Sequence, residues 1–333
     1  MSEKKVAAIV IGRNEGERLK NAIISIRDQV HLQIYVDSGS TDSSVVVAAD
    51  LGVHIVELDM SIPFTAARAR NAGFEKLQSL EGSDHFTYVQ FVDGDCKLDD
   101  GWITVATRFL DDHPSVAAVR GILSEQFPER TRYNQMCNME WGSSVGEIAA
   151  CGGIAMMRRS AFEEVGGFDP SIIAGEEPEL CYRLRRKGWK IFSVGEKMAL
   201  HDANITRFSQ WWDRSVRSGH AYAEGHARAG HLFTGFCAKD VWSIVFWALF
   251  VPVLGVTSAV WTQGAGLLLF AGYGVLWWRI RSSRLDRGDS TKNAVLYTNY
   301  CILGKFAQLL GVLKFWNNRL AGRYSNIIEY KGP

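Results

Sequence analysis

The sequence predicts an α/β fold: a doubly wound, mostly parallel sheet flanked by helices, followed by a C-terminal transmembrane helical hairpin and an interfacial helix. Three observations support this prediction. Short apolar runs alternate with amphipathic segments in the first part of the chain, polar clusters follow three of these runs, and no charged residue occurs between Val241 and Trp278. Alternating strands and helices are typical of parallel sheets, and a long uncharged stretch is typical of membrane spans.

The composition excludes one class of partner and indicates a compartment. The 333 residues include 37 Lys and Arg against 36 Asp and Glu, a net charge of +1, which argues against a nucleic-acid binder with its usual basic excess. The six cysteines form no Cys-x-x-Cys pair, so neither a zinc ribbon nor a disulfide framework is indicated. We expect reduced thiols in the cytosol.

Four apolar runs predict buried strands at residues 6–11, 33–36, 53–58 and 86–92. Helical spacing of apolar side chains predicts helices at residues 15–29 and 65–80. In such sheets, ligands bind beyond the carboxyl ends of the strands. Three polar clusters follow these ends, and we expect them to share one crevice: Arg13-Asn14-Glu15, Asp37-Ser38-Gly39 and Asp93-Gly94-Asp95.

The third cluster carries the most specific chemistry. Asp93 and Asp95 directly follow a predicted buried strand, and two carboxylates there can hold Mn²⁺ or Mg²⁺ while leaving positions for phosphate oxygens. His201 follows a predicted strand at residues 190–194 and a turn at residues 195–200. It is either a third metal ligand or a hydrogen-bonded surface residue. Asp37 either accepts from a nucleotide base or belongs to an ordinary turn.

Two glutamates open a predicted helix that has Pro178 in its first turn. Glu176 and Glu177 either complement the helix dipole or supply a general base that deprotonates an acceptor hydroxyl. Arg68 and Arg70 belong to an earlier helix, and because they are two positions apart they face different directions. At most one of them is expected to reach a diphosphate.

The C-terminal region, residues 236–333, is expected to attach the protein to a membrane. Residues 241–261 have the length that spans a hydrocarbon core, and a shorter apolar return completes a hairpin over about 241–281. Tryptophans gather near the segment ends and arginines follow, as in interfacial belts and cytoplasmic loops. The alternative is a buried hairpin in a soluble domain. Residues 293–316 predict an amphipathic interfacial helix.

Together these motifs resemble the family 2 glycosyltransferases of the GT-A fold, over roughly residues 6–207. The matching segments are Ile9-Val-Ile-Gly-Arg-Asn-Glu15, Val36-Asp-Ser-Gly-Ser-Thr-Asp42, Ala69-Arg-Asn-Ala-Gly73, Asp93-Gly94-Asp95 and Gly175-Glu-Glu-Pro-Glu-Leu180. The resemblance implies an inverting, metal-dependent glycosyltransferase domain over residues 1–235, of the membrane-associated bacterial type. Its catalytic domain would face the cytoplasm at the inner membrane.

The resemblance also implies roles for individual residues. Nucleotide-sugar binding is expected from Arg13, Asn14, Glu15, Asp37, Arg70, Asp93 and Gly94. The metal would be held by Asp93 and Asp95, with His201. The base falls on Glu177, where the family usually has Asp, and Glu176 stays the alternative.

The acceptor side is expected around Gly152 and Gly153, in a segment close to the family's acceptor-side strand and helix. Trp211 and Arg214 lie in a predicted helix over residues 207–228. We expect them to contact lipid headgroups or the diphosphate of a lipid-linked acceptor.

The sequence therefore predicts transfer of one sugar from a nucleotide-diphosphate sugar to a lipid-linked or glycan acceptor, as in exopolysaccharide assembly. The Gln-x-x-Arg-Trp motif of the family's processive synthases does not occur at Gln210-Trp-Trp-Asp-Arg214. Two alternatives stay open. A sugar-nucleotide nucleotidyltransferase would require a glycine-rich basic loop after the first strand. A catalytically silent membrane scaffold would be expected to have lost Asp93, Asp95 or Glu177.

Overall fold

The chain forms two compact units. The computed structural model describes residues 5–142, 145–228, 235–323 and 327–329. The first unit consists of Met1–Pro128 with Glu140–Asn204, and the second of Glu129–Met139 with Ile205–Pro333. The predicted domain boundary at residue 235 falls inside the second unit.

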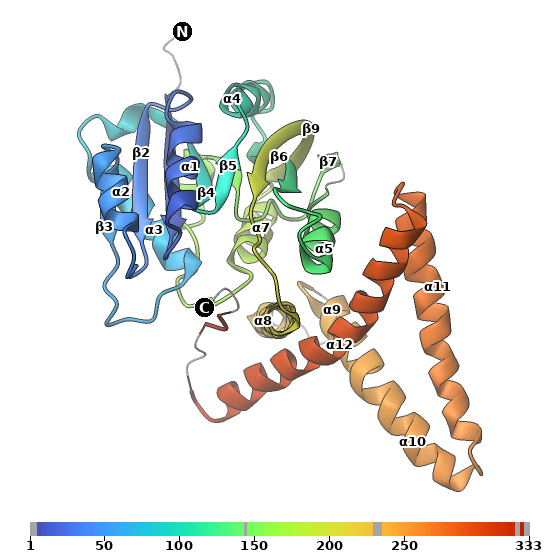
Figure 1. Ribbon diagram of the computed structural model, residues 1–333. Helices are drawn as coiled ribbons and strands as arrows, with labels where there is room; N and C mark the ends of the chain where they lie inside the picture. The colour runs from blue at the N-terminus through green and yellow to red at the C-terminus, as the bar shows by residue number, and fades with distance from the viewer. Residues whose placement is uncertain (1–4, 143–144, 229–234, 324–326, 330–333) are drawn as a thin grey trace. The chain divides into compact units, whose positions relative to one another are not determined.

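The first unit is built on a nine-stranded sheet (Figure 1). Its strands are β1 Lys5–Gly12, β2 Leu32–Asp37, β3 His54–Glu57, β4 Phe86–Asp93, β5 Cys96–Leu98, β6 Val116–Glu125, β7 Gly146–Glu147, β8 Ala155–Arg158 and β9 Lys190–His201. Its helices are α1 Glu17–Ile26, α2 Ser44–Asp50, α3 Ala66–Ser79, α4 Trp102–Asp112, α6 Arg159–Glu164 and α7 Glu176–Arg186, with a 3-10 turn η1 at Ser83–His85.

The sheet has a parallel part and a mixed part. Its order is β3-β2-β1-β4-β8-β6-β9-β5, with β7 beside β9. The first four strands in this order are parallel, as the strand–helix alternation predicts, whereas β8 is antiparallel to both β4 and β6. Because β1 lies between β2 and β4, the loops that follow these three strands adjoin at one edge of the sheet.

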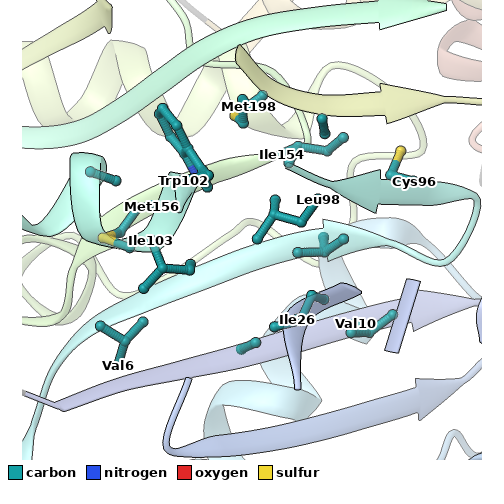
Figure 2. Close-up of a cluster of buried hydrophobic side chains, with 14 of the residues drawn as sticks. Val6, Val10, Ile26, Cys96, Leu98, Trp102, Ile103, Ile154, Met156 and Met198 are labelled. Atoms are coloured by element: carbon teal, nitrogen blue, oxygen red, sulfur yellow. The ribbon is translucent and has the colours of Figure 1, made fainter. Parts of the chain in front are cut away.

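Helices cover both faces of the sheet, because the central strands are buried on both sides. Side chains of β1 alternate between two cores, with Val6, Ala8 and Val10 in one and Ala7, Ile9 and Ile11 in the other. This alternation follows the two-residue period of a strand. Figure 2 shows the first core, to which α1 contributes Ile26 and α4 contributes Trp102. The second core is completed by α3, α6 and α7.

α3 lies close to the sheet because of Gly73. A Cβ atom at Gly73 would be 2.4 Å from Ile9 Cγ2 and 3.0 Å from Val36 Cγ2, so a larger residue would push the helix away from β1 and β2. The short distance between helix and sheet lets Arg70, almost one turn earlier, reach the end of β4.

The predicted turn at residues 195–200 is wrong. The structure continues β9 from Lys190 to His201, and a register shift between Arg120 and Ile122 of β6 absorbs the irregularity around Gly195, as a β-bulge does. His201 therefore ends a strand and is paired in register with Cys96 of β5.

In the second unit the described residues form a set of helices (Figure 1). They are α8 Phe208–Arg228, α9 Ala238–Val245, a π-helical turn η2 Phe246–Phe250, α10 Val251–Trp261, a 3-10 segment η3 Ala265–Phe270, α11 Ala271–Asp286 and α12 Thr291–Leu320. The helix α5, Arg132–Trp141, begins in this unit and ends in the first.

The predicted hairpin is formed by α9 to α11. Ala238–Trp261 is one continuous helical stretch, and by length and composition it is long and apolar enough to cross a membrane. After η3 the chain returns along α11, where Tyr273 donates a hydrogen bond to the carbonyl of Trp247 and the two rings lie 5.4 Å apart.

α12 packs against α8 through glycines. A Cβ atom at Gly219 of α8 would be 2.0 Å from the carbonyl oxygen of Gln308, and one at Gly311 of α12 would be 2.0 Å from that of Val216. Small residues thus allow the two backbones to approach closely. The opposite side of α12 exposes large apolar side chains: Leu303, Leu310, Leu313 and Trp316.

Candidate active site

The loop after β2 is a turn built around the carboxylate of Asp37, which is 2% exposed. Oδ2 accepts hydrogen bonds from the backbone N–H groups of Gly39 (2.9 Å) and Ser40 (2.8 Å). Oδ1 accepts from the hydroxyls of Tyr35 (2.7 Å) and Ser40 (2.5 Å). Burial and this carboxylate raise the pKa of Tyr35. Because four donors already surround Asp37, it shapes the turn in this structure.

The loop after β1 is fastened to the same turn. Asn14 Oδ1 accepts from the backbone N–H of Thr41 at 2.7 Å, and the backbone N–H of Asn14 donates to Ser40 Oγ at 2.9 Å. Asn14 has a left-handed φ of 55°, which asparagine adopts more readily than most residues. The first two polar clusters predicted from the sequence therefore form one structure.

The other predicted residues of this loop are also held in place. The guanidinium of Arg13 lies 4.8 Å from the centre of the Phe64 ring, and Glu15 pairs with Arg18 at 2.8 Å. Gly94 packs against the same loop, since a Cβ atom there would be 3.2 Å from Glu15 Cγ. The third polar cluster thus adjoins the first.

Arg70 lies among three carboxylates. Its Nη2 donates to Asp93 Oδ1 at 2.9 Å, its Nη1 donates to Glu176 Oε1 at 2.8 Å, and Nη1 is 3.4 Å from Glu177 Oε1. The side chain is 2% exposed and lies over the Phe168 ring. Burial lowers the pKa of Arg70, but the carboxylates raise it by more. The guanidinium therefore stays charged, and the cluster carries an excess of negative charge.

The pKa of Glu177 is affected by this excess of negative charge. Burial, followed by the neighbouring carboxylate of Glu176, raises the pKa of Glu177 to about 7, against a smaller lowering effect of Arg70. Gly153 leaves room for these side chains, because a Cβ atom there would be 2.6 Å from Arg70 Nη2 and 2.9 Å from Glu177 Oε1. A carboxyl group with a pKa near neutrality is suited to general acid–base catalysis.

The two glutamates of α7 differ in how firmly they are held. The Glu176 side chain is 5% exposed and accepts a hydrogen bond from Arg70 at 2.8 Å. The Glu177 side chain is 17% exposed, and its Oε1 lies 3.4 Å from Arg70 Nη1. A ligand can reach Glu177 with less displacement of protein groups. The Glu177 carboxyl group is therefore the more accessible of the two.

Asp95 belongs to a separate group with two potential metal ligands. Its Oδ2 is 3.1 Å from His201 Nε2, and its Oδ1 is 3.4 Å from Cys96 Sγ. Ligand atoms of these three residues lie within 4.8 Å of one another. The His201 ring stacks on Trp141, with centres 4.4 Å apart and an angle of 6°. Asp93, predicted as a ligand beside Asp95, accepts a hydrogen bond from Arg70 through Oδ1.

Three residues near the site were not predicted from the sequence. Cys96 directly follows Asp95, which could have drawn attention to it, but no local signal marks Trp141. Arg120 of β6 also lies here, because its Nη1 would be 3.7 Å from a Cβ atom at Gly152, and burial lowers its pKa. Trp141 and Arg120 could be found only from the tertiary structure.

Arg68 and Trp211 have other surroundings. Arg68 donates to backbone carbonyls of the loop before α3, among them those of Ile62 and Pro63, so only Arg70 of this pair joins the carboxylates. Trp211 is 3% exposed, with its ring against Tyr300 in the second unit. It therefore contributes to the packing of that unit. Arg214, on the same helix, is partly exposed.

Comparisons with known proteins agree with this fold. Residues 7–166 match the sequence profile of Glycosyl transferase family 2. The chain is 26% identical over 236 residues to the O-antigen chain rhamnosyltransferase RfbN of Salmonella typhimurium, covering 64% of this chain and 72% of that protein. It is 28% identical over 211 residues to the succinoglycan biosynthesis protein ExoA of Rhizobium meliloti, covering 59% of this chain and 60% of that protein.

Among solved structures, the chain is similar to the mannosyltransferase PcManGT of Pyrobaculum calidifontis, determined in complex with GDP-Man and Mn²⁺. The TM-score is 0.59 at 16% identity, covering 93% of this chain and 87% of that one. This similarity supports the GT-A fold. The chain therefore carries a family 2 glycosyltransferase domain, as its motifs predict.

Proposed function

We propose that this protein transfers a single sugar from a nucleotide-diphosphate sugar to an acceptor hydroxyl, with inversion at the anomeric carbon. The observation that carries the proposal is the position of Glu177. A carboxyl group with a pKa of about 7 lies beside Arg70 and Asp93, at the strand ends where a GT-A domain binds its donor. The family match and the glycan-building names of the similar proteins support the reaction class.

In the proposed reaction, ionised Glu177 takes the proton of the acceptor hydroxyl. The acceptor oxygen forms a bond to the anomeric carbon from the face opposite the diphosphate, and the bond between that carbon and the diphosphate oxygen breaks. The nucleoside diphosphate leaves with the electron pair. Arg70 positions the carboxylates, and Arg13 together with the turn of Asp37 and Asn14 provides the surface for the nucleotide.

The residues around Asp95 fit a divalent cation. A carboxylate oxygen and an imidazole nitrogen 3.1 Å apart are spaced as two neighbouring ligands of one ion, and Nδ1 of His201 is buried without a hydrogen-bond partner among the described residues. We propose that Asp95 and His201 bind Mn²⁺ or Mg²⁺, with Asp93 beside them. A bound cation would neutralise charge on the leaving diphosphate.

We further propose that the helices from Ala238 to Asp286 attach the protein to the inner membrane, with the catalytic domain facing the cytoplasm. Large apolar side chains on this hairpin are exposed, including Phe250, Val260, Trp261 and Leu268. Their exposure in water would be costly, whereas lipid would cover them. A membrane location favours a lipid-linked acceptor, and the partners would then be the donor, this acceptor and membrane lipids.

The reaction is tested by nucleotide release from a panel of UDP-, GDP- and dTDP-sugars. We would use the full chain in detergent, with Mn²⁺ or EDTA and a polyprenyl-diphosphate sugar as acceptor. Metal-dependent, acceptor-stimulated release from one donor is expected. Donor binding without release from any member of the panel would favour a silent scaffold, and release of pyrophosphate from a nucleoside triphosphate would favour a nucleotidyltransferase.

Membrane attachment is tested by fractionation. The full chain is expected to stay with membranes after an alkaline carbonate wash and to be released by detergent. A chain that remains soluble without detergent would overturn this part of the proposal while leaving the transfer reaction in place.

A further inference from the structure

A cavity of about 500 Å³ lies in the second unit, between α9–η2, α11 and α12. Its walls are of two kinds. Trp247, Leu276 and Ile280 supply an apolar wall, while Arg279, Arg284 and Arg287 supply a cationic one. The combination of an apolar wall and guanidinium groups is suited to an amphiphile with an anionic head.

The polarity of the cavity changes along α11. Leu276, Ile280, Arg284 and Arg287 recur at intervals of three or four residues, so they share one side of the helix. Arg279 lies beside the apolar pair, and Arg284 and Arg287 follow it. The helix rises about 16 Å between Leu276 and Arg287, so the apolar side chains lie toward one end of the cavity, while guanidinium groups occur along its whole length.

The three arginines have different partners. Arg284 is 7% exposed, its Nε is 2.5 Å from Asp289 Oδ2, and its guanidinium lies 4.4 Å from the centre of the Tyr297 ring. Arg284 is thereby fixed and largely neutralised. Arg279 and Arg287 are exposed, and in the described part of the chain neither has a carboxylate within ion-pair distance.

We propose that this cavity binds the phosphate of an anionic membrane lipid between Arg279 and Arg287, with an acyl chain along Trp247, Leu276 and Ile280. Guanidinium groups bind phosphate through several N–H donors, and the hydroxyl of Ser283 also lines the cavity. The apolar wall favours a lipid over a free phosphate ion. The inference rests on the membrane attachment proposed above.

The test is calorimetric titration of the full chain in a non-ionic detergent. The probes are dioctanoyl phosphatidic acid, dioctanoyl phosphatidylcholine and inorganic phosphate. We expect the phosphatidic acid to bind most tightly. Equal affinity for phosphatidylcholine would overturn the requirement for an anionic head, and equal affinity for inorganic phosphate would overturn the assignment to a lipid.

Matched variants locate the binding. Arg279→Gln/Arg287→Gln should weaken binding of the phosphatidic acid about 25-fold, since each arginine near an anionic lipid contributes about fivefold. The control is Arg281→Gln/Arg319→Gln, which removes the same charge from two arginines that lie over Trp277 and Trp316 outside the cavity. Equal weakening in the control would overturn the proposal.

A third variant fills the apolar part of the cavity and leaves the charge of the protein unchanged. Ile280→Trp should weaken binding of the phosphatidic acid at least as much as the arginine pair does, and unchanged binding would overturn the assigned acyl-chain position. Donor binding is measured on the same preparations. Lost donor binding with retained lipid binding would count against the proposed function alone, and the converse result would count against the lipid site alone.

Discussion

The two acids of the Asp93-Gly94-Asp95 turn are identical in type and separated by a single glycine, yet they belong to different groups. Asp93 has a side chain that is 31% exposed and bonded to Arg70, which it shares with Glu176 and Glu177. The Asp95 side chain is 4% exposed and lies beside His201. One acid therefore belongs to a network that contains its own cation, and the other lies among potential metal ligands.

This difference teaches that a symmetric motif need not carry symmetric chemistry. The chain turns at Gly94, and the two carboxylates on either side of it have separate partners, Arg70 of α3 and His201 of β9. In the proposed reaction the Arg70 group handles the proton of the acceptor and the Asp95 group handles the charge of the diphosphate. Changes in the two groups should therefore have different kinetic and binding signatures.

The largest effect is expected for Asp95→Asn. Loss of this carboxylate should reduce transfer about 1000-fold, the size of effect that removal of a preorganised charge-stabilising group can have. It should also abolish calorimetric binding of Mn²⁺. Asp93→Asn should leave more Mn²⁺ binding than Asp95→Asn does. If both variants keep Mn²⁺ binding, the metal binds elsewhere.

Glu177→Gln removes the proposed base. Its kcat should fall about 100- to 10,000-fold, the usual contribution of a general base, while binding of the donor changes little. Glu176→Gln is the matched comparison, because it alters the adjacent glutamate and its hydrogen bond to Arg70. A larger loss of kcat in Glu176→Gln would exchange their roles.

The pH dependence should report the same carboxyl group. Because Glu177 must be ionised to accept a proton, kcat/KM should fall about tenfold per unit below pH 7 and level off above it. The fall should be lost in Glu177→Gln, which leaves only the residual rate. A wild-type profile that is flat between pH 5 and 8 would contradict the assignment.

The free energy of unfolding should change with pH in the opposite direction to kcat/KM. The pKa of Glu177 is raised from 4.5 to about 7 in the folded state, so between these values the folded protein holds a proton that the unfolded chain releases. The free energy of unfolding therefore falls as pH rises through this window, and above pH 7 Glu177→Gln should be more stable than the wild type by on the order of 1 to 3 kcal/mol. Denaturant unfolding at pH 5 and pH 8 measures this difference.

Gly153→Ala should disturb the Arg70 group without changing any charge. The added methyl group would lie within 3.0 Å of Arg70, Glu177 and Asp93 atoms, and displacement of this size should reduce kcat about 10- to 100-fold. Mn²⁺ binding should persist, because Asp95 and His201 are not among these neighbours. Gly195→Ala is the control, since its nearest neighbour is 3.6 Å away.

The smallest effect on the chemistry is expected for Gly311→Ala. The methyl group would meet the backbone of α8 at 2.0 Å and should destabilise the second unit by about 1 to 3 kcal/mol, with little change in donor binding by the first. Gly274→Ala, in a helical position with no neighbour within 4 Å, is the control and should not destabilise. Thermal unfolding of both variants distinguishes packing from a change in catalysis.

The sequence alone determined much of the parallel half of the sheet. The apolar runs of β1, β2 and β4, the N-terminal strands that carry the polar clusters, and the convergence of those clusters follow from local periodicity and from the geometry of parallel sheets. Motif resemblance then identified the family, which the match to residues 7–166 confirms.

Only the tertiary structure decided which side chains became partners. Arg70 meets Glu176 across 106 positions of sequence, and His201 meets Asp95 across the same separation. These pairings depend on the order of the strands and on the bulge that lets β9 continue over residues 195–200, where a turn was predicted. Neither feature can be recognised from the local sequence. Backbone periodicity is a short-range property, whereas the position of a side chain depends on packing by the rest of the unit.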